Sequence, residues 1–206
     1  IKSELEKLTK KRYYAPTLKD DYSFQYKDPE IISFETEQLQ GVYTKILNHK
    51  FTLKSNGGPE LPEWLSKTKL KIGQSEYQMG IGGLHSTEKS QYIAKTDDQI
   101  LCDMDVASYY PNIILQQKLY PESLGEPFLK VYQSIVNRRI EAKRNNDKVT
   151  ADTLKICVNG SFGKLGSKYS ALYSPDLLIQ TTITGQLALL MLIEQLELAG
   201  IRVVSG

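Results

Sequence analysis

Two aspartates, Asp103 and Asp105, stand two residues apart in a stretch predicted to be a strand, residues 99–106. On a strand, residues i and i+2 point to one face, so both carboxylates would project together. Oxygen ligands of this kind are the ones that Mg²⁺ prefers. The residues that follow, Ser108 to Pro111, end regular pairing and offer hydroxyls and aromatic rings beside such a metal. This pattern suits a nucleoside triphosphate; the alternative is an edge strand whose acids face water.

A second group of polar side chains lies in two predicted helices, residues 127–145 and about 150–162, joined by a turn as an antiparallel hairpin. Lys155, Asn159 and Phe162-Gly163 recur at helical spacing and share one face, and Arg139 and Lys143 are i, i+4 neighbours. Residues 127–168 contain nine Lys and Arg against three acids, a charge of +6, while the rest of the chain sums to −4. Cationic groups on facing helices can hold a triphosphate, and the alternative is a solvated basic face.

A third candidate is the glycine-rich stretch from Gly80 to Ser86. Its glycines allow a backbone to approach a ligand or another chain closely. The alternative is a tight turn into the next strand.

Composition limits the class of protein. The chain has 206 residues, 40% hydrophobic and 24% charged, and a net charge of +2, which is ordinary for a globular domain. Cys102 and Cys157 form no CxxC pair, so we expect buried thiols in a reducing compartment rather than a disulfide or a zinc site. No signal peptide is visible, and the longest apolar run, residues 187–193, is far short of the roughly 20 residues that span a bilayer. We therefore expect a soluble intracellular chain without membrane contact, and a piece of a longer protein.

Periodicity predicts further elements around these residues. A short amphipathic turn or two begins at Ile1, and helices are predicted in residues 34–47 and 176–199, the latter buried against a sheet and ended by Gly200. Strands are predicted at 22–26, 69–71, 76–81 and from 201 onward.

Two of these stretches resemble motifs of family B DNA polymerases. Residues 105–113, Asp-Val-Ala-Ser-Tyr-Tyr-Pro-Asn-Ile, resemble motif A, and residues 155–163, Lys-Ile-Cys-Val-Asn-Gly-Ser-Phe-Gly, resemble motif B. Residues 80–86 resemble the glycine-rich loop between exonuclease and palm. The order and the hairpin between the motifs are similar to the family's palm–fingers–palm path, most of all in phage and other viral members. The chain departs from the family's pattern at Gly80, Tyr109, Asn112, Gly160 and Phe162.

The resemblance implies a DNA-directed DNA polymerase, a nucleotidyltransferase that adds deoxynucleotides to a primer 3′-hydroxyl with two Mg²⁺ (or Mn²⁺) ions. Asp105 would be catalytic and would bind metal together with the Val106 carbonyl, whereas Asp103 lies outside the motif. The partners would be primer–template DNA and deoxynucleoside triphosphates, and Tyr110 would be the ring that excludes a ribose 2′-hydroxyl. The implied nucleotide-binding residues are Ser108, Tyr109, Tyr110, Arg139, Lys143, Lys155 and Asn159. The implied DNA-binding residues are Gly82, Gly83, Phe162, Gly163, Lys164 and Lys168.

The expected fold is α+β: an antiparallel polymerase palm sheet containing residues 99–106 and 201–206, backed by the 176–199 helix, with a helical-hairpin fingers subdomain. The expected ranges are 1–77 leading into the palm, 78–126 palm, 127–166 fingers and 167–206 palm. The family's second catalytic aspartate, in motif C, is expected beyond residue 206, so we predict that this chain alone does not polymerise. A phage-encoded protein would act in the host cytoplasm. Two alternatives stay open: a polymerase-derived module that binds nucleic acid or nucleotide without catalysis, and an unrelated α+β domain.

Overall fold

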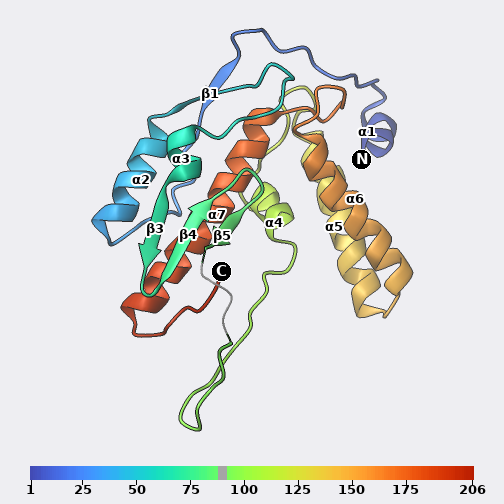
Figure 1. The fold of residues 1–206 in the computed structure, drawn as a ribbon. Helices are drawn as coiled ribbons and strands as arrows, with labels where there is room; N and C mark the ends of the chain where they lie inside the picture. Colours follow the sequence, from blue (N-terminus) through green and yellow to red (C-terminus); the bar gives the residue numbers. More distant parts are fainter. Residues whose placement is uncertain (88–91) are drawn as a thin grey trace.

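The computed structural model describes residues 1–87 and 92–206 (Figure 1). Within these residues the chain forms seven helices and two small antiparallel sheets, which confirms the predicted α+β class. The arrangement of these elements does not by itself identify a polymerase fold. The elements in chain order are α1 (Lys2–Thr9), β1 (Ser23–Gln25), α2 (Glu37–Leu47), β2 (Lys50–Thr52), α3 (Glu63–Lys67), β3 (Lys69–Ile72), β4 (Ser75–Met79), β5 (Leu84–Ser86), α4 (Tyr109–Gln116), α5 (Pro127–Arg144), α6 (Lys148–Lys164) and α7 (Pro175–Leu198).

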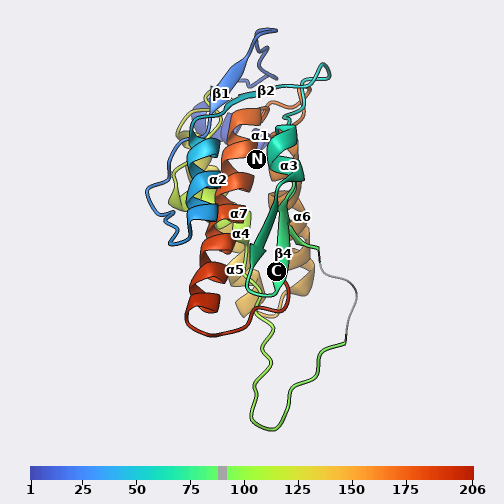
Figure 2. The ribbon, with the colours of Figure 1, turned by 60° about the vertical axis from the view of Figure 1, so that its left-hand side comes forward.

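The long helix α7 runs through the middle of the molecule (Figures 1 and 2). It begins with Pro175, whose fixed φ suits a first helical position, and Asp176 follows in the first turn. It ends before Gly200, whose φ of +79° is the left-handed conformation that glycine adopts without strain. The sequence prediction of a buried helix over 176–199 is confirmed.

Two hydrophobic clusters meet on α7. The first joins β2, α2, α3, β3 and β4 to the middle and C-terminal part of α7, around Phe51, Leu70, Tyr77 and Ile183. The second joins α1, α4, α5 and α6 to the start of α7, around Leu5, Phe128 and Leu177. Figure 1 shows these two groups of elements on opposite sides of α7. The N-terminal third of the chain therefore shares its core with α7.

By length and composition α7 would also be able to cross a membrane, a property that the short apolar run in the sequence does not suggest. Most of its apolar window is buried inside the protein, as in the core helix of a globular domain. The predicted lack of membrane contact stays a prediction.

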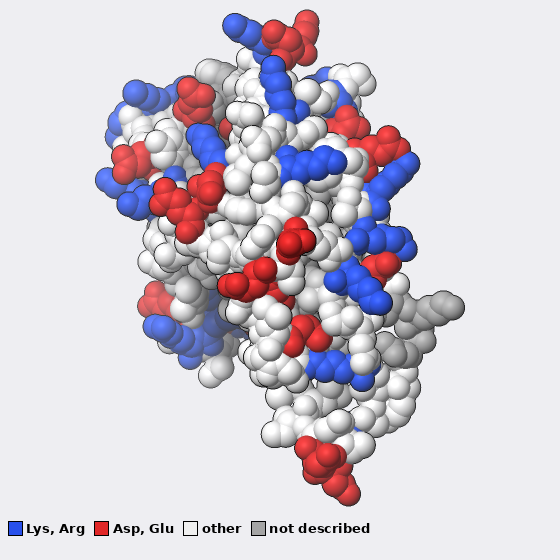
Figure 3. All heavy atoms as spheres, turned by 90° about the vertical axis from the view of Figure 1, so that its left-hand side faces the viewer, with Lys and Arg blue, Asp and Glu red and all other residues white. Residues whose placement is uncertain are grey.

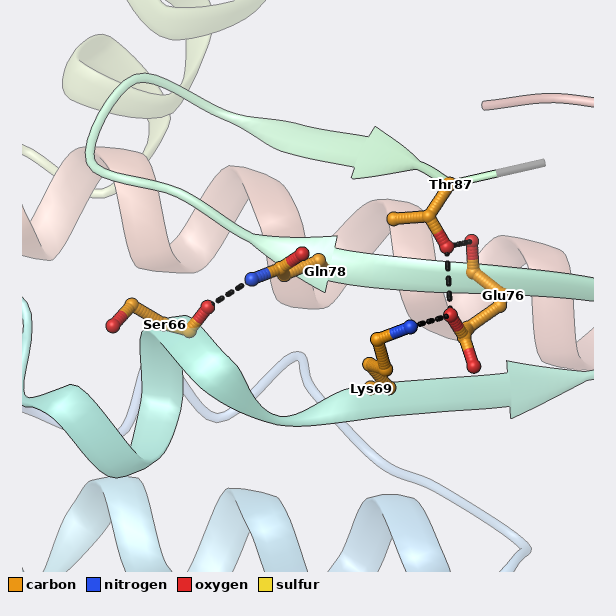
Figure 4. A network of polar contacts seen from close by, with 5 residues as sticks. All are labelled: Ser66, Lys69, Glu76, Gln78 and Thr87. Carbon is orange, nitrogen blue, oxygen red and sulfur yellow. Dashed lines mark hydrogen bonds and ion pairs between the residues drawn. The ribbon is translucent and has the colours of Figure 1, made fainter. Parts of the chain in front are cut away.

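The strands form two separate antiparallel sheets, β1-β2 and β3-β4-β5. In the second sheet Leu70 pairs with Tyr77, and both side chains are buried against α7. Its other face carries a polar network (Figure 4). There Glu76 accepts hydrogen bonds from Lys69 at 2.8 Å and from the Thr87 hydroxyl at 2.9 Å, and the Gln78 amide donates to the Ser66 carbonyl. The strands predicted at 69–71 and 76–81 form as β3 and β4, but β4 ends at Met79, and Ile81 is exposed beyond it.

Two predicted palm strands are absent, which corrects the sequence prediction. Residues 99–106 form no regular structure, and their apolar side chains face solvent, with Ile100 and Met104 each 88% exposed. Residues 201–206 lie beside β5, where Ser86 N–H donates to the Gly206 carbonyl at 3.2 Å, without forming a strand. A strand needs a row of backbone partners, and among the described residues neither segment has one.

The predicted helical hairpin is confirmed. Helices α5 and α6 pack against each other and project together from the second cluster (Figure 1). The turn places Asn146 at a φ of +57°, and the Asp147 carboxylate accepts from Thr150 N–H at 3.1 Å as the N-cap of α6. The helix therefore begins at Lys148, about two residues before the predicted start near residue 150.

The cysteine prediction is partly wrong. Both thiols are free, as expected, but Cys102 is exposed in the 99–106 segment and Cys157 is only half-buried on α6. Cys102 is exposed because the strand predicted to bury it does not form.

Candidate functional site

The motif residues meet in a stack of aromatic rings that we call the ring stack: Tyr109 and Tyr110 of α4 and Phe162 of α6. The Tyr110 and Phe162 rings are nearly parallel, with centroids 4.8 Å apart, and the Tyr109 and Tyr110 centroids are 5.7 Å apart. Helices α4 and α6 are held against each other in the second cluster, which brings motif A and motif B residues into contact. Stacked aromatic pairs contribute about 0.5–1.5 kcal/mol beyond their buried area.

The glycine-rich loop closes over one edge of the ring stack. The Tyr110 hydroxyl donates to the Gly82 carbonyl at 2.7 Å, and a Cβ at Gly83 would stand 3.3 Å from that hydroxyl oxygen. Gly80 N–H in turn donates to the Gln186 side-chain oxygen at 3.0 Å, and the Gln186 amide donates to the Gly80 carbonyl, also at 3.0 Å. Gln186 lies buried on α7, so the loop is tied to the central helix and to motif A at once.

Gly185 of α7 makes room for the ring stack. A Cβ there would stand 3.0 Å from the Tyr110 ring, 3.2 Å from the Tyr109 ring and 3.2 Å from Ile113. The Tyr109 hydroxyl donates to the Gly185 carbonyl at 2.6 Å. Burial raises the pKa of Tyr109 to about 12 and raises the pKa of Tyr110 as well, so both phenols are neutral donors at physiological pH.

Ser108 and Arg139 form the polar end of this arrangement. Ser108 has φ 53° and ψ 46°, a left-handed conformation uncommon for serine, at the N-cap position of α4. Arg139 lies on α5, and its Nη1 donates a hydrogen bond to the Ser108 hydroxyl. The Nε of Arg139 is buried with no hydrogen-bond partner among the described residues. No ion pair neutralises Arg139 within residues 1–87 and 92–206. A cation beside the start of α4 has spare capacity for an anion.

The other predicted cationic and DNA-contacting residues lie outside the ring stack. Their side chains are exposed on the hairpin and just beyond it, and none of the lysines forms an ion pair in the part of the chain that the structure describes. Adding a Cβ at Gly163 would meet nothing within 4 Å, so its surface is open. The residues in this group are Lys143, Lys155, Asn159, Gly163, Lys164 and Lys168.

The acidic residues differ from the ring stack in that their side chains are exposed to solvent. Asp103, Asp105 and Val106 are exposed on the segment 92–107, which extends away from the body of the protein (Figures 1 and 2). Among the described residues no three His, Cys, Asp or Glu side chains come together in a way that could hold a metal ion. The side chains present therefore do not make a complete Mg²⁺ site, and we derive no chemical step through a metal.

Charge is distributed unevenly over the surface. Figure 3 shows the face with α2 and α3, where basic and acidic side chains are interspersed. Such a mixed face is typical of a solvated surface, whereas residues 127–168 carry +6. A polyanion would be attracted to the hairpin rather than to the face with α2.

Two residues of this site were missed by sequence reasoning, Gly185 and Gln186. Both stand inside the mostly apolar α7, where Gly185 and several buried polar residues interrupt the apolar pattern: Thr181, Thr182, Thr184, Gln186 and Glu194. Such interruptions are the signal that would have found them, because a buried amide must be satisfied by a partner.

No protein-family model matches the chain, and the searches of curated proteins and of solved structures give no match either. The resemblance to polymerase motifs therefore stays a prediction that rests on the quoted residues and on their placement in the fold.

Proposed function

We propose that the chain is the palm and fingers part of a family B DNA polymerase, which adds deoxynucleotides to a primer 3′-hydroxyl. The observation that carries the proposal is the ring stack. Residues far apart in sequence, Gly82, Tyr110 and Phe162, lie in contact, and the three motif resemblances name these same positions. The contact between the three motif stretches supports the proposal, because residues that share a nucleotide site must lie together.

In this proposal each group of residues has a chemical task. Arg139, Lys143 and Lys155 neutralise the triphosphate, and Ser108 and the backbone at Tyr109 contact it, since these groups are free of competing carboxylates in the described structure. Asn159 lines the nucleotide pocket, and Tyr110 lies under the incoming sugar, where its ring excludes a 2′-hydroxyl. Gly82, Gly83, Phe162, Gly163, Lys164 and Lys168 contact the primer–template DNA.

The proposed function also includes a divalent metal ion. Mg²⁺, or Mn²⁺, would be held by the catalytic Asp105 and the Val106 carbonyl, and bound metal would polarise the phosphoryl group and the attacking hydroxyl. Action in the host cytoplasm, with phage origin, belongs to the same proposal.

The second candidate is a polymerase-derived module that binds nucleotide or nucleic acid without catalysis. The observation that favours it is the exposed position of Asp105, with no cluster of metal ligands around it among the described residues. The two candidates share the ring stack and differ in whether nucleotide is incorporated.

The test is single-nucleotide incorporation by the natural protein at its full length, comparing deoxyribonucleotide with ribonucleotide. Replacing Tyr110 with Val should raise ribonucleotide use relative to deoxyribonucleotide use by at least about tenfold, because a steric block worth a few kcal/mol is removed. Tyr110→Phe keeps the ring and should keep the discrimination. The ratio is measured on one preparation, so partial unfolding cancels.

Tyr14→Val is the matched control, since Tyr14 is 74% exposed in the N-terminal segment, far along the chain from the motifs. An unchanged ratio in Tyr110→Val would contradict the proposed role of Tyr110. Nucleotide binding with no incorporation by any form of the protein would favour the non-catalytic module.

A further inference from the structure

A hollow with basic walls lies between the connection from α6 to α7 and the loop after β2. These two segments are drawn in the upper part of Figure 1. Its volume is about 550 Å³. We call it the lysine hollow. The residues that define it are Lys19, Lys54, Gly57, Lys168, Tyr169 and Tyr173.

The walls of the lysine hollow are fixed in place. Tyr173 is buried, with 4% of its surface exposed, and its hydroxyl donates to the Gly57 carbonyl at 2.5 Å. Gly57 closes a tight turn with a φ of +81°, and its N–H donates to the Lys54 carbonyl at 2.8 Å. A Cβ at Gly57 would stand 3.1 Å from the Tyr173 hydroxyl and 3.2 Å from Lys168, so the turn and the α6–α7 connection fit closely.

The charge in the lysine hollow is positive and unpaired. Lys19, Lys54 and Lys168 line it against one acid, Asp20. None of the three lysines takes part in an ion pair within residues 1–87 and 92–206. Three lysines around a hollow of this size attract an anion with several charges spaced along it, such as a chain of phosphates.

An exposed aromatic ring stands at the same place. Tyr169 is 85% exposed, and the Lys168 ammonium lies 5.5 Å from the centroid of its ring. A large apolar ring left in water beside cations is the combination on which single-stranded nucleic acids bind, with bases stacked on the ring and phosphates on the lysines. A run of acidic residues offers charge but no ring to stack on Tyr169, so the two features together favour a single-stranded nucleic acid.

We propose that the lysine hollow binds a single strand of nucleic acid, with phosphates held by Lys19, Lys54 and Lys168 and a base stacked on Tyr169. The site extends the α6 surface that ends at Lys164, only a few residues before Lys168, and recruits two lysines from the N-terminal region, which carries no recognised motif. The proposal rests on the proposed function only in the expectation that a nucleic acid is the partner.

The experiment measures fluorescence anisotropy of a labelled oligothymidylate of about 10 nucleotides over a range of salt concentrations. Changing Lys19, Lys54 and Lys168 together to Gln should reduce the slope of log affinity against log salt by about 2, because each phosphate contact on a single strand contributes about 0.7. Tyr169→Ala should weaken binding by about tenfold with the slope unchanged.

The matched control changes three other exposed lysines, Lys7, Lys71 and Lys118, to Gln, which removes the same net charge elsewhere. A second arm uses an oligomer of abasic sites, which should bind wild-type protein and Tyr169→Ala equally. Equal salt slopes for the two triple variants would overturn the proposal, and so would an acidic peptide that competes with the oligonucleotide at equal charge concentration.

Failure of this proposal can be told apart from failure of the proposed function. Lys155→Ala lies outside the lysine hollow, so it should reduce nucleotide incorporation while weakening oligothymidylate binding far less than the Lys19, Lys54 and Lys168 variant does. Binding in the lysine hollow without any incorporation would contradict only the polymerase assignment. Incorporation with normal salt slopes in the Lys19, Lys54 and Lys168 variant would contradict the hollow and the DNA contact proposed for Lys168, and would leave the polymerase assignment standing.

Discussion

The ring stack and the acidic segment 92–107 belong to the same motif resemblance but are built in different ways. Tyr110 is half-buried, stacked on Phe162 and bonded to the Gly82 carbonyl. Asp105, five residues earlier, is exposed on a segment with no regular structure. The rings are placed by contacts within the chain, because packing and hydrogen bonds over-determine their position. Among the described residues, Asp103 and Asp105 have no such contacts. In the proposed function the bound metal would fix the position of Asp105.

Among the tests of this difference, the substitution Gly185→Val should have the largest effect on the free energy of unfolding. The added side chain would collide with both tyrosine rings of α4, since a Cβ alone would stand 3.0 Å from Tyr110. We expect a loss of about 3 kcal/mol in the free energy of unfolding, measured by denaturant titration.

Gly160→Val is the matched control for that substitution. Gly160 lies in α6, where an added Cβ meets nothing within 4 Å, so the same change should be neutral or slightly stabilising. Equal effects at the two glycines would mean that the ring stack is not closely packed on α7.

A second test removes the side chain that holds the glycine-rich loop. Gln186→Ala removes the α7 partner of the half-buried Gly80 N–H and carbonyl, and leaves the N–H only its bond to the Gly83 carbonyl at 2.9 Å. We expect a loss of about 2 kcal/mol, together with faster amide hydrogen exchange over residues 80–84. Gln195→Ala, on an exposed turn of the same helix, should change stability by less than about 0.5 kcal/mol. Unchanged exchange at Gly80 would show that the loop is held by other contacts.

A third, smaller effect is the coupling between Tyr110 and Phe162. The single changes Tyr110→Leu and Phe162→Leu and the double change form a thermodynamic cycle measured by denaturant unfolding. We expect a coupling free energy of about 1 kcal/mol for rings whose centroids lie 4.8 Å apart. A coupling of zero would mean that the two rings do not stack in solution.

Long periodic elements were predictable from the sequence for a simple physical reason. Apolar residues recur over three or more turns in α5, α6 and α7. A pattern of this length predicts a helix even where single residues do not fit it. Short strands were predictable where polar and apolar residues alternate, as in β1, or where two strands pair across a short turn, as β3 pairs with β4. The 99–106 stretch was predicted as a strand from local alternation, but a strand also needs a distant partner, which local patterns do not reveal.

The candidate site was predictable residue by residue but not in its contacts. The motif resemblance named Gly82, Tyr110 and Phe162, yet it did not indicate that the Tyr110 hydroxyl would bond to the Gly82 carbonyl. It also gave no role to Gln186, because an amide inside a helix has no periodic signal until its partner is known. Contacts of this kind depend on how α4, α6 and α7 cross, which is a property of the whole core.

The smallest expected effect concerns the acids themselves. Asp103→Asn and Asp105→Asn should each change the free energy of unfolding by less than about 0.5 kcal/mol, because both carboxylates are exposed and form no ion pair within the described residues. In the proposed function only Asp105→Asn should abolish nucleotide incorporation by the full-length protein, and Asp103→Asn should leave it within a few-fold. Each variant therefore serves as the control for the other, since the two differ only in position on one exposed segment. A loss of stability above about 1 kcal/mol in Asp105→Asn would show that this carboxylate is held by the protein, and the contrast with the ring stack would then be wrong.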